Sequence, residues 1–260
     1  MPPPNDDDVF PRDVHLVRRG NGGLPPSNEL VKLLVNARSE YSWPEHVGAR
    51  KSQQTIIDLE SSVAVLLGNL NPINAQEICL RVSDWAGNNA PALAAIQNAT
   101  PTTRERMHLA ISLLGSPEGL DVGLKALSNL PGISLVIASK VYRFCYPEGG
   151  ASIDRHASYF FNSLDIVDPG NDRTKATHFG REWANGRHTA SRLATFNNTG
   201  LTRNLKEFLE NYLPLLSKIA VGLNALPALF RCSGTGELKY WRPTDVEMAA
   251  YYWWAQHGPR

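Results

Sequence analysis

The chain has 260 residues, of which 42% are hydrophobic, so it can bury a sizeable core as one large or two small domains. A formal net charge of +1 and a pI near 7.8 exclude a globally basic protein, so any surface for polyanions must be local. The three cysteines match no zinc, cluster or disulfide spacing, which is typical of a reducing compartment, and no histidine pattern indicates a metal site.

The first 26 residues are rich in proline, glycine and charge, and we expect them to form a flexible tail. They do not combine a positively charged start with an apolar core, so no secretory signal is predicted. With the cysteine usage, this indicates a cytoplasmic protein.

Helical spacing of apolar residues dominates the chain after the tail. Ser27 can cap a first helix, and 53–67 carries a second helical pattern. Asn74 and Glu77 have the spacing of a capping box before a third helix. Further helices are predicted at about 89–98, 102–114 and 118–129, with proline or glycine between them.

The last third is also predicted to be helical after a turn at 168–172. The apolar stretch 213–230 contains two prolines, a lysine and an asparagine, so it indicates a buried helix and not a membrane span. Thr244 and Glu247 have capping-box spacing before a final helix with four consecutive aromatic residues, 251–254. We expect these aromatics to pack against the N-terminal helices; the alternative is a stacking wall. No run alternates as a strand does, so the chain is predicted to be all-α.

A tight hairpin is predicted at Leu130-Pro131-Gly132-Ile133-Ser134. Proline fixes φ, and glycine supplies backbone conformations that other residues avoid. A helix predicted to begin at Ile133 would add unpaired first-turn amides and its positive dipole end. We therefore expect one phosphate to be bound here, by the backbone of Gly132, Ile133, Ser134 and Val136.

This hairpin, with the sequence Ile153-Asp154 beyond it, resembles the helix-hairpin-helix DNA glycosylases. Their pattern is Leu-Pro-Gly-Val-Gly, a helix, a loop, and an apolar residue followed by an essential aspartate. Residues 130–133 match, Ala138 fits the small residue of the second helix, and Asp154 follows 22 residues after Gly132. Ser134 departs from the second glycine. The resemblance covers roughly residues 117 to 160.

The resemblance implies an all-α fold with two helical lobes. We expect a tail over 1–26, a lobe over 70–160 that holds the helix-hairpin-helix at about 118–145, and a discontinuous second lobe. The second lobe would join 27–69 to 161–260.

The implied activity is excision of a base from DNA. A carboxylate at Asp154 would stabilise the positive charge that develops on the deoxyribose and assist water, after the base has left the stack. Asp154 is also typical of a helix N-cap, and both roles are compatible. Taken alone, Asp154 favours the role of a helix cap. Because the hairpin precedes it at the family spacing, the two together favour catalysis. The alternatives are a non-catalytic DNA-binding protein and a purely structural helical scaffold.

Family members that also cleave the strand carry a lysine where this chain has Val136, so the resemblance implies a monofunctional enzyme. Lys140 lies one helical turn further on, displaced by about 6 Å, and is the one substitute nucleophile; the alternative is a solvated or phosphate-facing lysine. The four-cysteine iron–sulfur cluster of some members is excluded, so no cofactor is expected. The resemblance allows a monovalent or divalent cation at the hairpin.

The implied partner is double-stranded DNA, bound by a monomer in the nucleoid, with no membrane contact. Candidate DNA contacts are Arg155, Arg181, Arg187 and Arg192, in or near a cationic segment that is equally typical of a solvated helix face. Trp183 and Phe196 are available for stacking. The base could be oxidised, alkylated, mismatched, or a modified base of foreign or phage DNA, and the sequence does not choose.

Overall fold

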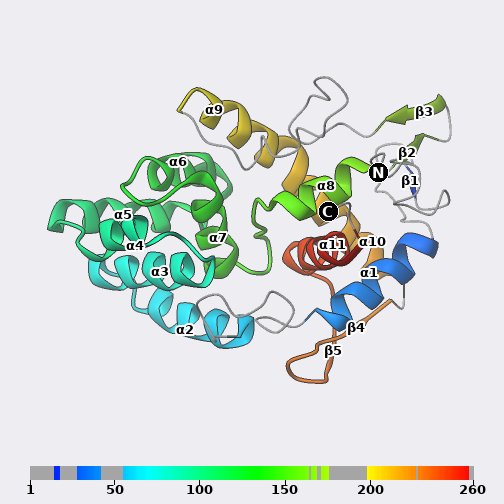
Figure 1. The fold of residues 1–260 in the computed structure, drawn as a ribbon, viewed down its shortest axis with the longest axis horizontal. Coiled ribbons are helices and arrows are strands. Elements are labelled where there is room, and N and C mark those ends of the chain that lie inside the picture. Colours follow the sequence, from blue (N-terminus) through cyan, green and yellow to red (C-terminus); the bar gives the residue numbers. More distant parts are fainter. Residues whose placement is uncertain are drawn as a thin grey trace, which may run out of the picture. The chain divides into compact units, whose positions relative to one another are not determined.

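The computed structural model describes residues 15–17, 28–41, 55–163, 165–168, 171–175, 198–226 and 228–257. Helices dominate this part of the chain (Figure 1), which confirms the all-α prediction. Of the predicted tail, only His15–Val17 is described, as strand β1. Within the described ranges, no helix combines the length and the apolar character needed to cross a membrane.

The chain divides into two compact units, each assembled from separated stretches. Unit 1 comprises 1–41, 154–195 and 210–260, and unit 2 comprises 42–153 and 196–209. These boundaries differ from those expected from the sequence. Helix α2 (Ile56–Gly68) belongs to unit 2, because its buried residues Ile56, Leu59 and Val63 face α3 and α7 of that unit. The return to unit 1 falls at Asp154.

Seven helices form the described part of unit 2. Besides α2 they are α3 (Pro72–Trp85), α4 (Ala90–Gln97), α5 (Pro101–Leu113), α6 (Pro117–Ser128), α7 (Leu135–Cys145) and α9 (Asn198–Glu207). Helices α3 to α6 each begin with a proline at the first or second position after a capping Asn, Thr or Ser. Proline suits this position because its missing N–H would lack a partner there anyway.

The predicted capping box at Asn74 and Glu77 is wrong. Helix α3 starts two residues earlier, at Pro72, where the Asn71 side chain accepts the N–H groups of Ile73 and Asn74 at 3.0 Å each. Glu77 instead pairs with Arg81 at 2.6 Å, one helical turn on. An asparagine followed by proline was the stronger start signal.

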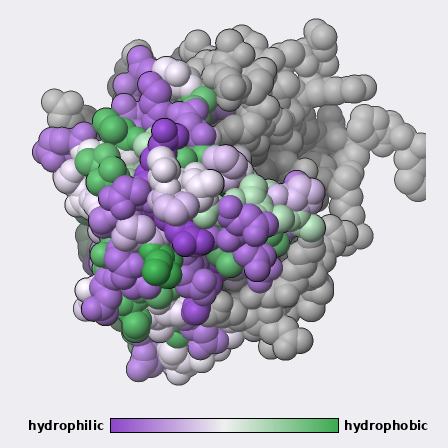
Figure 2. Space-filling model, turned by 90° about the vertical axis from the view of Figure 1, so that its left-hand side faces the viewer, coloured by the Kyte–Doolittle hydropathy of each residue, from purple (hydrophilic) through white to green (hydrophobic). Residues whose placement is uncertain are grey.

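The core of unit 2 lies where α3, α5, α6 and α7 pack together. It includes one buried cation, Arg143, which lies 3.4 Å from the Glu60 carboxylate and over the Phe144 ring at 4.1 Å. Outside the core, large apolar side chains are exposed on α5 and α6, among them Leu109 and Val122. Figure 2 shows that hydrophobic residues on this face form separate patches among hydrophilic ones.

Unit 1 is built around α11 (Pro243–His257), which packs against α1 (Asn28–Glu40), α8 (Arg155–Ser163) and α10 (Leu213–Ala225). All eight residues from Pro243 to Ala250 are buried, so this helix start is enclosed on every side. Strands β1, β2 (Asp165–Asp168) and β3 (Asn171–Lys175) form one small sheet, in which β1 and β2 are parallel and β2 and β3 antiparallel.

A short antiparallel hairpin, β4 (Phe230–Arg231) and β5 (Leu238–Lys239), precedes α11. Before α10, the helix widens into the π-helical segment η4 (Phe208–Tyr212). Pro214 lies just beyond it and has no N–H to donate to the carbonyl four residues earlier, which removes one α-helical bond at this point. Tyr212, at the end of η4, is fully buried.

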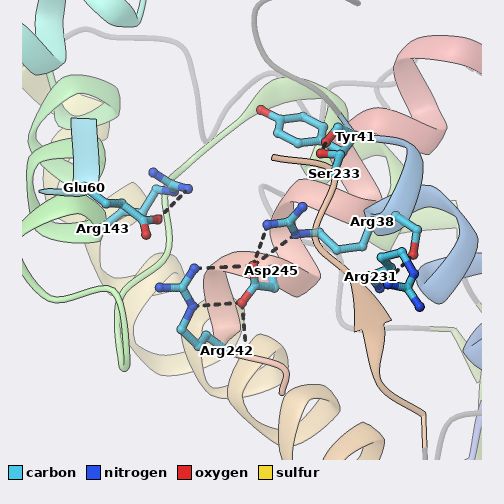
Figure 3. Close-up of polar contacts among 9 residues, drawn as sticks. Arg38, Tyr41, Glu60, Arg143, Arg231, Ser233, Arg242 and Asp245 are labelled. Carbon is cyan, nitrogen blue, oxygen red and sulfur yellow. Dashed lines mark hydrogen bonds and ion pairs between the residues drawn. The ribbon is translucent and has the colours of Figure 1, made fainter. Parts of the chain in front are cut away.

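A buried ion cluster joins α1 to the start of α11 (Figure 3). Arg38 donates two hydrogen bonds to Asp245 Oδ1, at 3.0 and 2.9 Å, and Arg242 Nε donates to Oδ2 at 2.9 Å. Burial opposes the charged form of Asp245, but the two guanidinium groups outweigh it and hold the pKa of this carboxyl below its usual value.

This cluster also corrects the predicted cap of α11. The helix begins at Pro243, one residue before the expected capping Thr244, and Asp245 Oδ2 accepts the backbone N–H of Arg242 at 3.2 Å. An acid at the third helical position thus reaches back to the residue before the helix, which is one half of a capping box. The predicted partner Glu247 lies one turn inside the helix and is buried.

Candidate nucleic-acid interface and catalytic carboxylate

The predicted hairpin is present between α6 and α7. Leu130 and Ile133 are buried, and the Ile133 N–H donates to the Leu130 carbonyl at 3.1 Å, which closes a tight turn. Gly132 has a φ of +80°, in the left-handed region that favours glycine. The Leu-Pro-Gly turn therefore forms as predicted, because glycine adopts the left-handed conformation that the turn requires.

Gly132 is also required by a close approach to helix α4. A Cβ at this position would come closer than 3.0 Å to the carbonyl oxygen of Ala92, a distance that real Cβ atoms do not reach. On the neighbouring loop, Asn88 Nδ2 donates to the Gly132 carbonyl at 3.1 Å. The hairpin is thus held by the α3–α4 turn as well as by its own hydrogen bond.

Helix α7 begins at Leu135, not at Ile133 as predicted. Ser134 is its N-cap, with extended backbone, and its hydroxyl accepts the Ile137 N–H at 3.4 Å. The reason for the shift is that Gly132 is left-handed and the Ile133 N–H is already used in the turn. Ile133 therefore cannot offer its amide to a phosphate, which corrects one of the four expected contacts.

The other three expected amides, those of Gly132, Ser134 and Val136, have no hydrogen-bond acceptor within the described residues. The same holds for Leu135, the first residue of α7, as is common for first-turn amides. With the positive end of the helix dipole they form the type of site that binds an anion. Ser134 adds a hydroxyl where the family pattern has glycine, and that hydroxyl caps the helix.

Val136 and Lys140 lie on the same face of α7, and both are half-buried. The Lys140 ammonium lies 5.7 Å from the centre of the Trp85 ring, a cation–π distance. The Lys140 side chain is thus directed at Trp85 within unit 2.

Asp154 forms the predicted cap of α8. Its Oδ1 accepts the His156 N–H at 2.7 Å, and its carbonyl accepts the N–H and the hydroxyl of Ser158 at 2.9 and 2.6 Å. The residue before it is anchored to α7, because the Ile153 N–H donates to Ser139 Oγ at 2.9 Å. The half-buried carboxylate thus has a fixed orientation at the point where the chain enters unit 1.

Two buried groups of unit 1, Tyr212 and Glu247, were not singled out for a site from the sequence. Burial raises the pKa of Tyr212 well above its ordinary value, and the negative charges of Glu247 and Asp154 raise it further. On α11, one turn beyond Glu247, the Tyr251 ring contacts the His156 ring edge-on at 5.3 Å. The available signal in the sequence was an acid between the apolar residues Val246 and Met248, but Glu247 was assigned to a cap.

The C-terminal aromatics pack mainly within unit 1. Tyr251 and Tyr252 each contact the Tyr41 ring, which follows α1, at 6.2 Å between centroids, and Trp253 contacts Phe160 of α8 at 5.7 Å. The expected packing against the N-terminal helices is confirmed for this part of the chain.

Several candidate residues lie outside the described residues. Arg155 begins α8, but its side chain is not described; the other candidates outside the described part are Arg181, Arg187, Arg192, Trp183 and Phe196. The cationic segment therefore stays a prediction.

The three cysteines are unpaired with one another and buried. Burial raises the pKa of Cys79 to about 12 and also raises that of Cys145, so neither is a reactive thiolate. Burial opposes the charged form of Cys232, but donors from Thr235 and Gly234 lower its pKa. Among the described side chains, no group of three or more His, Cys, Asp or Glu residues could hold a metal ion.

Comparisons of this chain with protein-family models, with curated proteins and with solved structures give no match. A function for the protein therefore depends on the hairpin, the start of α7 and the carboxylate at α8.

Proposed function

We propose that this protein is a monofunctional DNA N-glycosylase, which flips out and excises a damaged or modified base and leaves an abasic site. One observation carries the proposal: a left-handed Gly132 turn leads into a helix start with unpaired amides, and Asp154 follows at the family spacing with its carboxylate oriented.

The hairpin supplies binding. The amides of Gly132, Ser134 and Val136, with that of Leu135, would hold one strand phosphate through neutral donors and the helix dipole. A phosphate site made of uncharged backbone amides needs no strongly basic chain, which agrees with a formal net charge of +1.

The carboxylate supplies the chemistry. As the bond between base and deoxyribose breaks, positive charge develops on the sugar, and a fixed carboxylate stabilises that charge more than the ground state. Asp154 would also orient the attacking water. Because its Oδ1 is held by the His156 N–H, little reorientation is needed during the reaction.

The reaction is expected to stop at the abasic site. Cleavage of the strand by a lysine requires an amine that forms a Schiff base with the sugar. The family's lysine position is Val136 here, and Lys140 lies over Trp85. The substrate class extends from oxidised, alkylated or mismatched bases to modified bases of foreign DNA.

The test is a panel of duplexes that carry such bases, followed by alkali to cleave abasic sites. The wild-type protein should give alkali-dependent cleavage of at least one duplex. Asp154→Asn should bind DNA and release no base, because asparagine preserves the cap but not the charge. Asp121→Asn, which removes an exposed carboxylate of α6, is the matched control and should retain activity.

Base release by Asp154→Asn at the wild-type rate would refute the catalytic role. Salt-dependent DNA binding without any base release by the wild type would indicate the non-catalytic DNA-binding protein instead. Strand cleavage without alkali would restore Lys140 as a nucleophile.

A further inference from the structure

Helix α3 ends in a motif that fixes the position of Asn88. Gly87 has a φ of +72°, its N–H donates to the Asp84 carbonyl at 2.9 Å, and the Asn88 N–H donates to the Ser83 carbonyl at 3.0 Å. These two bonds form a Schellman motif, which ends the helix and holds the next residue. The Asn88 backbone is therefore set directly by α3.

The Asn88 side chain is fixed at both ends as well. Its Oδ1 accepts the Asn89 N–H at 3.1 Å, and its Nδ2 donates to the Gly132 carbonyl at 3.1 Å. The Asn89 side chain in turn caps α4 by accepting the Ala92 N–H at 2.9 Å. The amide that meets the hairpin thus has a single orientation, set before any ligand binds.

This arrangement does not fit a cation at the hairpin. A monovalent or divalent cation would be held there by backbone carbonyl oxygens. The Gly132 oxygen already accepts from Asn88, and the Leu130 oxygen accepts from the Ile133 N–H. Each carbonyl oxygen has a second lone pair, but the positive ends of the two N–H dipoles point at the same oxygens and weaken their attraction for a cation.

We propose that Asn88 is a positioning residue that takes the place of a cation: its amide holds the Gly132 peptide, so the hairpin binds a DNA phosphate without any metal ion. The inference rests on the proposed function, because it concerns how the hairpin meets DNA. Gly132 is two residues before the cap of α7, so a displaced Gly132 peptide would also shift the amides of Ser134, Leu135 and Val136.

The experiment measures binding of the full chain to a fluorescent unmodified duplex by anisotropy. One buffer contains potassium and magnesium chlorides; the other contains tetramethylammonium chloride and a chelator at the same ionic strength, because DNA binding depends on salt. The wild type should have the same Kd in both. Asn88→Asp should bind roughly tenfold more weakly in tetramethylammonium, since two oxygens then face each other. Potassium and magnesium should restore part of the loss.

Asn129→Asp is the matched control. Asn129 Nδ2 also donates to a backbone carbonyl, that of Lys125 at 2.8 Å, and lies next to the hairpin. It adds the same charge without touching Gly132, so its binding should be independent of the cation.

A second readout does not need DNA. Hydrogen exchange of the Ile133 amide should be slow in the wild type in both buffers and faster in Asn88→Asp than in Asn129→Asp. The proposal is overturned if wild-type binding or Ile133 protection is lost in tetramethylammonium, or if the two variants behave alike. If the wild type binds no DNA in any buffer, the proposed function fails, and Ile133 exchange still decides the role of Asn88.

Discussion

Three glycines of unit 2 allow the two energetic costs of an alanine in the hairpin to be measured separately. Gly132 has both a left-handed φ and a backbone oxygen in the way of a Cβ, Gly87 has the left-handed φ with open space around it, and Gly68 has neither. Changing each to alanine therefore isolates first the backbone strain and then the close approach of the hairpin to α4.

The expected magnitudes follow from these differences. At Gly68, alanine should stabilise the protein by about 0.5–1 kcal/mol, because it favours the helix. At Gly87, left-handed strain of about 1–2 kcal/mol is partly offset by lower entropy of the unfolded chain, which leaves a loss of about 1 kcal/mol. At Gly132, displacement of the Ala92 carbonyl adds about 1–3 kcal/mol, for a total loss of about 2–4 kcal/mol.

Urea unfolding followed by far-ultraviolet circular dichroism measures the three free energies. The order of stability should be Gly68→Ala, wild type, Gly87→Ala and Gly132→Ala. If Gly132→Ala loses no more than Gly87→Ala, then the hairpin does not approach α4 as closely as the structure has it, and the support for Asn88 is lost with it.

The other predictions concern charged groups. Asp245→Asn should destabilise the protein by about 3–5 kcal/mol in urea unfolding, because it leaves the buried Arg38 guanidinium without a counter-charge; a loss below about 1 kcal/mol would contradict this. Since the folded-state pKa of Asp245 is lowered, its contribution should be complete above about pH 4 and disappear as pH falls through the folded pKa. The difference in urea midpoint between wild type and variant should then shrink only in acid. Lys140→Met should keep wild-type base release, and borohydride should trap no DNA on either protein; trapping on the wild type alone would assign Lys140 a covalent role.

Local signals in the sequence predicted much of the fold. The helices at 90–97, 101–113 and 117–128 fall within one residue or so of their predicted bounds, because Pro91, Pro101 and Pro117 each lie one or two residues after a capping residue. The hairpin was predicted because its glycine and proline define the turn without help from the rest of the chain. The sequence did not decide correctly between neighbouring capping residues: Asn74 was predicted to cap α3, and Asn71 caps it.

Long-range partners could not be predicted from one sequence. Asn88 and Gly132 are 44 residues apart, and Arg38 and Asp245 are 207 apart, so no periodic pattern links them. The sequence therefore predicted the hairpin and the aspartate of the candidate site. It did not predict that the Asn88 side-chain amide holds the hairpin. Tyr212 was missed for the same reason, since its burial beside two carboxylates depends on packing between distant helices.

The interleaving of the two units has a consequence for synthesis. Residues 42–153 emerge from the ribosome before unit 1 has its stretch 210–260, which includes α10 and α11. Unit 2 can thus assemble most of its helices early, with α9 added later against α6. Arg38, by contrast, is synthesised 207 residues before Asp245, so α1 stays without its buried counter-charge until Asp245 has been made.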